Sequence, residues 1–173
     1  MKAKEILFSR LIKERRSPCF EIQSSQLQII TDPTDYYLAL HKLSNQATHR
    51  ISMTALYLGT GKLEKYLISK LNSKVKTNEQ LKLTLLLDYM RGTRIGRDGS
   101  SSVQMLKPLK LDNFNRPIRV GFYHNPDTGL FKGKFSNSPL REIFGVHHMK
   151  AHVFDNNVLI TGANLSEDYF TDR

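Results

Sequence analysis

Apolar residues follow two alternating rhythms along the chain after residue 26. Short apolar runs predict β-strands at 27–31, 51–58, 81–88, 117–123, 148–154 and 158–161. Apolar residues at helical spacing predict α-helices at 33–47, 62–74 and 102–109, with another helix starting at 164. Strands that alternate with helices form layered folds, so the pattern predicts an α/β domain with a mixed β-sheet flanked by helices.

Turn-forming residues mark the boundaries of these elements. Asp32 and Pro33 suit the N-cap and the first turn of the first helix. Residues 91–102 are rich in Gly, Arg and Ser and predict a loop, and residues 124–144 contain two prolines and two glycines and predict a long irregular excursion. The sequence Asp155-Asn156-Asn157 predicts a tight turn between the last two strands, because Asp and Asn tolerate positive φ.

The start of the chain is strongly basic. Six of its first sixteen residues are Lys or Arg and two are Glu, while Ala3, Leu7 and Leu11 recur every four residues. Such a segment is either a targeting presequence or an amphipathic helical extension. We therefore separate residues 1–26, a basic N-terminal segment, from residues 27–173, which would form the α/β domain.

The amino-acid composition limits the classes of partner that the chain is expected to bind. The chain has 173 residues, with 26 Lys and Arg against 16 Asp and Glu, which gives a net charge of +10. This excess predicts an anionic partner: nucleic acid, an anionic lipid surface or a phosphorylated substrate. Cys19 is the single cysteine, which excludes an internal disulfide and a four-cysteine zinc site. The apolar runs are far shorter than the ~18 residues that a membrane-spanning helix needs.

His148 and Lys150 are the strongest candidates for chemistry. Two positions apart on a predicted strand, their side chains would share one face, with Cα atoms roughly 6.6 Å apart. A neutral imidazole is able to attack phosphorus, and a neighbouring ammonium binds phosphoryl oxygens and disfavours protonation of the imidazole. The pair predicts phosphate-directed chemistry; the alternatives are a plain strand histidine and a solvent-facing lysine. His147 and His152 are expected to be structural or peripheral.

Other residues offer either phosphate contacts or simple structural roles. Gly59-Thr60-Gly61, between a strand and a helix, would cradle a phosphate with backbone N–H groups or form a tight turn. Arg91 and Arg94 follow a strand end, where open α/β sheets bind ligands, and would contact phosphate or belong to a solvated loop. Asn164, three residues before Glu167, would contact phosphate, cap a helix or do both.

These candidates belong to a longer ordered set. In chain order it comprises Ala55-Leu56-Tyr57-Leu58-Gly59-Thr60-Gly61 with Leu63-Glu64, then Leu87-Asp88-Tyr89-Met90-Arg91-Gly92-Thr93-Arg94, His148-Met149-Lys150, Gly162-Ala163-Asn164-Leu165-Ser166, and Tyr169-Phe170-Thr171 with Arg173. The set resembles the phospholipase D superfamily, and within it the eukaryotic CDP-diacylglycerol–glycerol-3-phosphate 3-phosphatidyltransferases. The resemblance runs from about residue 27 to Arg173. One departure from the wider superfamily is Gly-Ala-Asn where Gly-Ser-x-Asn is usual.

The resemblance implies a transferase of phospholipid biosynthesis. Such enzymes make phosphatidylglycerophosphate and CMP from CDP-diacylglycerol and glycerol 3-phosphate, on the route to phosphatidylglycerol and cardiolipin in mitochondria. Carried over, His148 would be the nucleophile or its acid/base counterpart, Lys150 would hold the phosphoryl oxygens, and Asp155 completes the motif. Asn164 and Ser166 would join the glycine loop and the two arginines in binding phosphate. No cofactor and no metal ion is implied, since the lysine and backbone donors neutralise charge.

Only one copy of the His-x-Lys motif is present. Superfamily sites are built from two such motifs, so that one histidine attacks while the other protonates the leaving group. The resemblance therefore implies one phospholipase D-like half-domain, the N-terminal half of a longer enzyme, whose partner is a missing C-terminal half with a second motif. It also implies a peripheral membrane contact, because the substrate is a lipid, and argues against nucleic acid as a partner.

Two other functions remain open from the sequence. A single-motif phosphodiesterase or nuclease would act as a homodimer, with two His148 side chains at one phosphorus. A non-catalytic basic module would bind a membrane or nucleic acid with a vestigial site. The first predicts hydrolysis by the lone chain, and the second predicts that His148→Ala leaves binding unchanged.

Overall fold

The computed structural model describes residues 20–96, 98–125 and 145–171, and the chain divides after Ile30 into two compact units. In the first unit the described residues contain one 3-10 helix, η1 (Ser24–Gln26). The strand expected at 27–31 is absent, because Leu27 and Ile29 are 62% and 81% exposed and no described strand pairs with them. That prediction was wrong. The amphipathic pattern of residues 3–11 lies outside the described residues.

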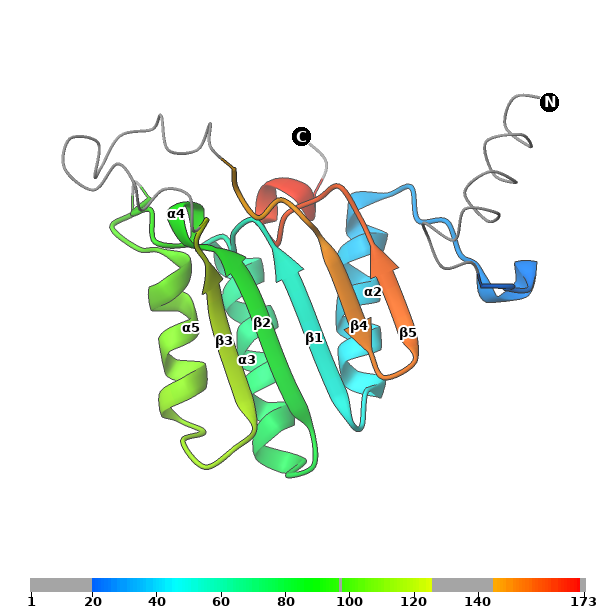
Figure 1. Ribbon diagram of the computed structural model, residues 1–173, viewed down its shortest axis with the longest axis horizontal. Helices are drawn as coiled ribbons and strands as arrows, with labels where there is room; N and C mark the ends of the chain where they lie inside the picture. The colour runs from blue at the N-terminus through cyan, green and yellow to red at the C-terminus, as the bar shows by residue number, and fades with distance from the viewer. Residues whose placement is uncertain (1–19, 97, 126–144, 172–173) are drawn as a thin grey trace. The chain divides into compact units, whose positions relative to one another are not determined.

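The second unit is built on a mixed sheet whose described strands have the order β3-β2-β1-β4-β5 (Figure 1). β1, β2 and β3 run parallel to one another, whereas β4 pairs antiparallel with β1 and β5 pairs antiparallel with β4. The sheet confirms the predicted fold class. The strand bounds are β1 (Arg50–Ala55), β2 (Lys82–Asp88), β3 (Ile118–Tyr123), β4 (Ala151–Phe154) and β5 (Asn157–Ile160).

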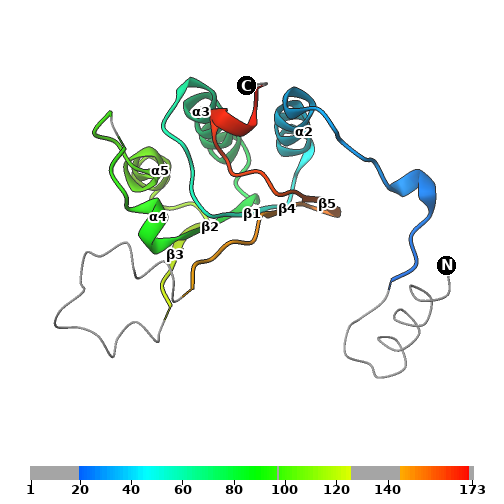
Figure 2. The same cartoon turned by 90° about the horizontal axis from the view of Figure 1, so that it is seen from above.

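The three longer helices lie together on one face of this sheet, as the view from above shows (Figure 2). α2 starts as predicted: Asp32 caps it by accepting the N–H groups of Thr34 at 2.7 Å and Asp35 at 3.2 Å, which stabilises a helix by about 1 kcal/mol. The helix bounds are α2 (Pro33–Gln46), α3 (Lys62–Thr77), α4 (Tyr89–Gly92), α5 (Ser102–Leu111) and the 3-10 helix η4 (Glu167–Tyr169).

Alternation of apolar and polar residues explains why the helices cover that face. In β1 and β2 every second side chain is buried against the helices, and the residues between them are half-buried. The buried members are Ile51, Met53, Ala55, Leu83, Leu85 and Leu87. Fully burying a residue such as Leu or Ile contributes about 1.5–3 kcal/mol, so this shared layer holds the sheet and helices together.

Strand direction divides the sheet into two ends. We call the end at which β1, β2 and β3 finish the carboxyl end, and the other the amino end. Because β4 is antiparallel to β1, the segment that leads into β4 lies at the carboxyl end, while the β4–β5 turn lies at the amino end (Figure 1). Loops at the carboxyl end of parallel strands are the usual place for ligands.

Two elements near the predicted motif differ from expectation. β4 begins at Ala151, so residues 148–150 are irregular backbone rather than strand. The helix expected from 164 is, in its described part, only the 3-10 turn η4, which has Ser166 rather than Asn164 at its N-cap. The N–H of Glu167 donates to the side chain of Glu64 at 2.5 Å, so the local cap that would start an α-helix does not form. The predicted excursion at 124–144 falls largely outside the described residues.

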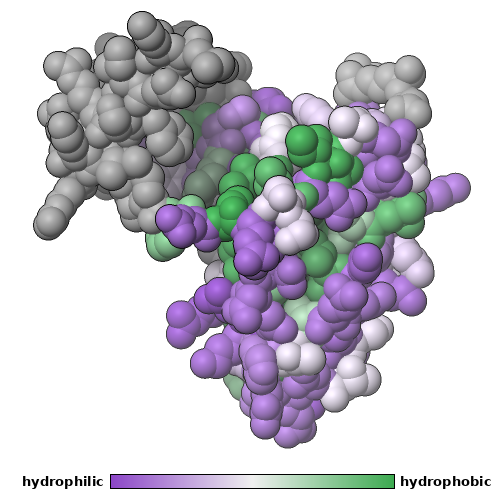
Figure 3. Space-filling view, turned by 90° about the vertical axis from the view of Figure 1, so that its right-hand side faces the viewer, coloured by the Kyte–Doolittle hydropathy of each residue, from purple (hydrophilic) through white to green (hydrophobic). Residues whose placement is uncertain are grey.

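The outer strand β5 leaves apolar side chains exposed. Val158 and Ile160 are 61% and 78% exposed. Figure 3 views the side of the molecule on which β5 ends the sheet and shows hydrophobic residues gathered among mainly hydrophilic ones. None of the helices in the described ranges is long and apolar enough to cross a membrane.

Candidate active site

Asp155 lies at the amino end of the sheet, away from the other two residues of its motif. Its carboxylate accepts the backbone N–H groups of Thr48, His49 and Arg50 at 2.7–2.9 Å and the hydroxyl of Thr48 at 3.2 Å. These hydrogen bonds hold the pKa of Asp155 far below its usual range, the backbone N–H of Thr48 contributing most. Asp155 also has a φ of 51°, as the turn prediction required. The carboxylate therefore anchors the β4–β5 turn to the α2–β1 connection.

His148 and Lys150 lie at the carboxyl end, just before β4. A strand rises about 3.3 Å per residue, so His148 and Asp155 are separated by roughly 20 Å of chain. His148 is exposed, whereas Lys150 is 5% exposed and its ammonium donates to the backbone oxygen of His148 at 2.9 Å. Burial lowers the pKa of Lys150. The strand expected from 148 begins only at Ala151, so that part of the prediction was wrong, and the alignment of the two side chains on one face stays a prediction.

A buried carboxylate fixes the backbone that precedes His148. Asp88, 2% exposed at the end of β2, accepts the N–H of Arg91 with one oxygen at 3.0 Å and the N–H of His147 with the other at 2.9 Å. His147 also hydrogen-bonds the hydroxyl of Thr54 in β1. Burial lowers the pKa of His147 and the Lys150 ammonium adds to this, while Asp88 opposes it. Asp88 thus ties the first turn of α4 to the residue beside His148.

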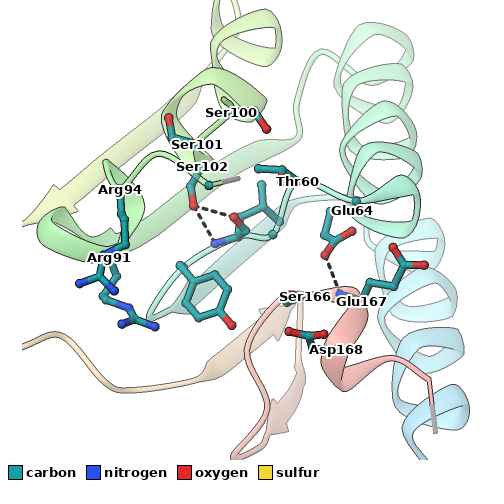
Figure 4. A pocket seen from close by; sticks show the side chains of 15 residues that line it. Thr60, Glu64, Arg91, Arg94, Ser100, Ser101, Ser102, Ser166, Glu167 and Asp168 are labelled. Atoms are coloured by element: carbon teal, nitrogen blue, oxygen red, sulfur yellow. Dashed lines mark hydrogen bonds between the residues drawn. The ribbon is translucent and has the colours of Figure 1, made fainter. Parts of the chain in front are cut away.

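A cavity of about 660 Å³ opens next to these residues at the carboxyl end (Figure 4). It lies among three connections: the one from β1 to α3, the one from α4 to α5, and the one from β5 to η4. Ser102 joins the first two, since its hydroxyl donates to the Leu58 oxygen at 2.6 Å and accepts the Leu58 N–H at 3.0 Å. The N–H of Gly59 donates to the Leu165 oxygen at 2.8 Å and joins the third.

Most of the predicted phosphate-binding residues line this cavity. Those that do are Gly59, Thr60, Gly61, Arg91, Arg94 and Ser166. Asn164 does not: it is 4% exposed, and its side-chain oxygen is buried with no hydrogen-bond partner among the described residues. His148, Lys150 and Asp155 are also absent from the lining. The structure therefore gathers the phosphate candidates but does not place them around the histidine.

The cavity carries charge of both signs. Figure 4 shows Arg91 and Arg94 on one side, with Glu64, Glu167 and Asp168 on the other. The guanidinium carbon of Arg91 lies 5.4 Å from the centre of the Tyr57 ring, within cation–π range. Burial raises the pKa of Tyr57, which keeps its hydroxyl protonated at neutral pH. These groups would suit a ligand with a negative end and a hydrogen-bond-donating end.

Several of these residues were not singled out by the sequence. Glu64 was noted only as part of the resemblance, although an acid in the first turn of a helix after two glycines is a recognisable signal. Ser101 is the N-cap of α5 and accepts the N–H of Gln104 at 3.4 Å, which a Ser before an apolar helix predicts. The contacts of Asp88 with His147 and of Glu167 with Glu64 gave no comparable signal, because these partners are distant in the sequence. No group of three His, Cys, Asp or Glu residues that could hold a metal ion occurs in the described ranges.

Sequence comparison finds relatives that share one named activity. The chain is 38% identical over 158 residues to a probable CDP-diacylglycerol–glycerol-3-phosphate 3-phosphatidyltransferase of Dictyostelium discoideum, covering 91% of this chain and 27% of the relative. The mitochondrial enzyme of that name from Homo sapiens is 36% identical over 162 residues, covering 90% of this chain and 28% of the relative. No protein-family model matches the chain.

Solved structures supply the fold. A phosphatidylserine synthase of Haemophilus influenzae superposes with a TM-score of 0.66 at 21% identity, over 86% of this chain and 31% of that one. Nuc of Salmonella typhimurium, described as a phospholipase D family member, gives 0.53 at 16% identity, over 79% and 68%. The chain is therefore similar in sequence to the named phosphatidyltransferases and shares the fold of these solved structures. This homologue of the phosphatidyltransferases spans between a quarter and a third of the length of the Dictyostelium and human relatives.

Proposed function

We propose that this chain supplies one half of a CDP-diacylglycerol–glycerol-3-phosphate 3-phosphatidyltransferase. The observation that carries the proposal is identity of 36–38% over about nine-tenths of the chain to relatives with that name. The His148-x-Lys150 motif and the cavity lie at the same end of the sheet, which agrees with phosphate chemistry there. The second half of the site would come from a segment with another His-x-Lys motif.

The reaction would proceed in two in-line displacements. In the first, an imidazole nitrogen attacks the phosphorus that carries the diacylglycerol, and the bond from that phosphorus to the CMP oxygen breaks. In the second, a hydroxyl of glycerol 3-phosphate attacks the same phosphorus, the histidine leaves, and phosphatidylglycerophosphate forms. His148 serves as the nucleophile or as the acid/base that passes the proton between the leaving and entering oxygens.

Lys150 would neutralise charge on the phosphoryl oxygens. Its ammonium donates to the backbone carbonyl oxygen of His148, so it is already held close to the backbone of the proposed catalytic residue. Binding of the substrate would replace that carbonyl with a phosphoryl oxygen, a stronger acceptor for a cation. Asp155 would act on the fold and not on the substrate, because its hydrogen bonds are all made at the amino end.

The proposal extends to location. Several relatives are named as mitochondrial, including those of Homo sapiens and Gallus gallus. We place this chain in the mitochondrion, at a membrane surface, because CDP-diacylglycerol is a lipid that resides in the bilayer. The net charge of +10 favours contact with anionic lipid head groups.

A second candidate is a phosphodiesterase that works as a homodimer. It is favoured by one observation: this chain covers 74% of NucT from Helicobacter pylori, with a TM-score of 0.53 at 16% identity, so a chain of comparable length adopts this fold. In that case two copies of His148 would meet at one phosphorus, and the lone chain would hydrolyse a phosphodiester.

A chimera separates the two. The matched segment of the Dictyostelium relative is replaced by this chain, and labelled CDP-diacylglycerol with glycerol 3-phosphate is offered to the chimera and to the lone chain. The phosphatidyltransferase proposal expects CMP and phosphatidylglycerophosphate from the chimera and neither from the lone chain. Hydrolysis of bis-p-nitrophenyl phosphate by the lone chain, with an inactive but folded chimera, would instead support the homodimeric phosphodiesterase.

A further inference from the structure

We propose that the 660 Å³ cavity binds a phosphate ester that carries a free vicinal diol, with its phosphate toward Arg91 and Arg94 and its diol toward Glu64. The inference rests on the proposed function for its choice of ligands. Both substrates of that reaction contain this chemistry: glycerol 3-phosphate has two adjacent hydroxyls, and the CMP part of CDP-diacylglycerol has the ribose diol. The cavity would therefore receive the acceptor or the nucleotide head group.

The phosphate end is set by two arginines and a helix start. Arg91 and Arg94 stand on one side of the cavity, and the N-terminal residues of α5, Ser101 and Ser102, stand beside them (Figure 4). The first amide groups of a helix have no intrahelical acceptor and carry partial positive charge, which favours a phosphate. Arg91 is steadied by the Tyr57 ring beneath it. Planar guanidinium groups bind phosphate oxygens in pairs, which adds direction to the attraction.

The diol end is set by Glu64, which is 1% exposed. One of its oxygens accepts the N–H of Glu167, and the other, Oε2, is buried with no hydrogen-bond partner among the described residues. A buried carboxylate oxygen that lacks a donor is costly, so a donor on a ligand would stabilise it. An ionised carboxylate only accepts hydrogen bonds, and it repels phosphate. Hydroxyl groups suit this site because they donate hydrogen bonds and carry no negative charge.

The loop Gly59-Thr60-Gly61 supports placing the phosphate near the arginines and the diol near Glu64. A Cβ atom at Gly59 would collide with Oε1 of Glu64, and one at Gly61 would collide with Oε2 of Glu167 and lie 2.7 Å from Oε2 of Glu64. The absence of side chains at the two glycines thus leaves room for the carboxylates of Glu64 and Glu167. A phosphate cradled by the same loop would sit against those carboxylates. The phosphate is therefore assigned to the arginine side, although the sequence had also suggested the loop.

The cavity volume fits either ligand. Sites for small molecules usually measure about 300–1,000 Å³, a range that includes a nucleotide head group. Glycerol 3-phosphate is smaller and would share the space with water. Charge placement selects the class of ligand, and binding measurements must choose between its two members.

Calorimetric titration of the 173-residue chain tests the inference. The probes are CMP, 2′-deoxy-CMP, sn-glycerol 3-phosphate, 3-hydroxypropyl phosphate and inorganic phosphate. We expect CMP or glycerol 3-phosphate to bind at least tenfold more tightly than its own analogue without the second hydroxyl, and more tightly than inorganic phosphate. The member of the pair that behaves in this way identifies the cavity as the nucleotide or the acceptor subsite.

Two substitutions sharpen the test. Glu64→Gln keeps an acceptor oxygen for the Glu167 N–H, and should reduce the preference for the diol to less than twofold. Arg94→Gln should weaken every phosphate probe about tenfold, inorganic phosphate included. The matched controls, Glu79→Gln and Arg119→Gln, remove the same charges from exposed positions near the amino end and should change neither quantity.

Two results would overturn the inference. One is equal affinity of the wild-type chain for each diol ester and its deoxy analogue, a comparison that needs no variant to fold. The other is a folded Glu64→Gln chain that retains the preference. The proposed function fails separately: diol-dependent binding by the lone chain with an inactive chimera would leave the cavity assignment standing. An active chimera whose KM values are unchanged by Glu64→Gln and Arg94→Gln would support the proposed function and contradict the cavity assignment.

Discussion

Two carboxylates at opposite ends of the sheet, Asp155 and Glu64, differ in how completely they are paired. At the amino end, Asp155 receives four hydrogen bonds from Thr48, His49 and Arg50, three of them from backbone N–H groups. At the carboxyl end, Glu64 and Asn164 each keep a buried oxygen without a partner among the described residues. A paired carboxylate stabilises the fold, while the unpaired oxygen of Glu64, which lines the cavity, would be available to a ligand. The sequence motif His148-x-Lys150-x4-Asp155 reaches both ends of the sheet, and we therefore expect its residues to have two different roles.

After His148, the largest effect should come from the lysine of the motif. Lys150→Met fills the same buried space but removes the ammonium that would neutralise the phosphoryl oxygens. The kcat of the chimera should therefore fall by about 10²–10³. Lys110→Met is the matched control, since the Lys110 ammonium also donates to a backbone carbonyl, that of Ile118 at 3.0 Å, but at the amino end. Rates of CMP release measure both. Equal losses of kcat in the two variants would contradict the view that only the carboxyl end takes part in catalysis.

A smaller effect concerns His152, in β4 between the two ends. It is fully buried, its Nε2 lies 3.1 Å from the Tyr36 hydroxyl, and burial lowers its pKa to about 4. Because the folded pKa lies below the unfolded value of 6.5, the unfolded state binds the proton first as the pH falls. The stabilisation is complete above pH 6.5, and the free energy of unfolding should drop by about 2 kcal/mol by pH 5.

Urea denaturation at pH 7, 6 and 5 measures this loss. His152→Gln keeps an acceptor for the Tyr36 hydroxyl but does not titrate, so its loss between pH 7 and 5 should be smaller by the same amount. Burial also lowers the pKa of His41 and His147, and they add a slope common to both proteins. An unchanged slope in the variant would show that His152 is not a neutral core histidine.

The smallest effect on catalysis should come from Asp155. Asp155→Asn keeps the turn residue compatible with positive φ but offers one acceptor oxygen in place of two. The melting temperature should fall, and kcat of the folded chimera should stay within about twofold of the wild type. The carboxylate contribution to stability is present above its unfolded pKa and is lost as pH falls through the depressed folded pKa. A kcat loss matching that of Lys150→Met would place Asp155 in the chemistry.

Sequence patterns predicted most of the fold because local signals agreed with the packing. Asp32-Pro33 started α2, the alternation in β1 and β2 matched their burial, and Asp155 formed the turn. Residues 27–31 do not form the predicted strand because an apolar run needs a partner strand, which the local sequence does not reveal. The helix after Asn164 failed because Glu64, a hundred residues away, took the N–H that a local cap would have used.

The sequence predicted which residues lie at the site but not how they are arranged. Gly59, Gly61, Arg91 and Arg94 gather at one cavity, as residues at the ends of parallel strands should. The alignment of His148 with Lys150 was inferred from strand periodicity, but the strand starts three residues after His148, so periodicity does not fix their arrangement. The distant hydrogen-bond partners of the buried carboxylates Glu64 and Asp88, the N–H groups of Glu167 and His147, could not be predicted from the sequence because they come from other connections.

The central claim is that His148 reacts at phosphorus, as nucleophile or as acid/base, and the most direct test is the rate of CMP release by the chimera that carries His148→Asn. His148 is exposed, so the substitution should leave the melting temperature unchanged. The account predicts that kcat falls at least about 10³-fold, because either catalytic role is lost. A folded His148→Asn chimera that releases CMP at a rate within tenfold of the wild type would contradict it.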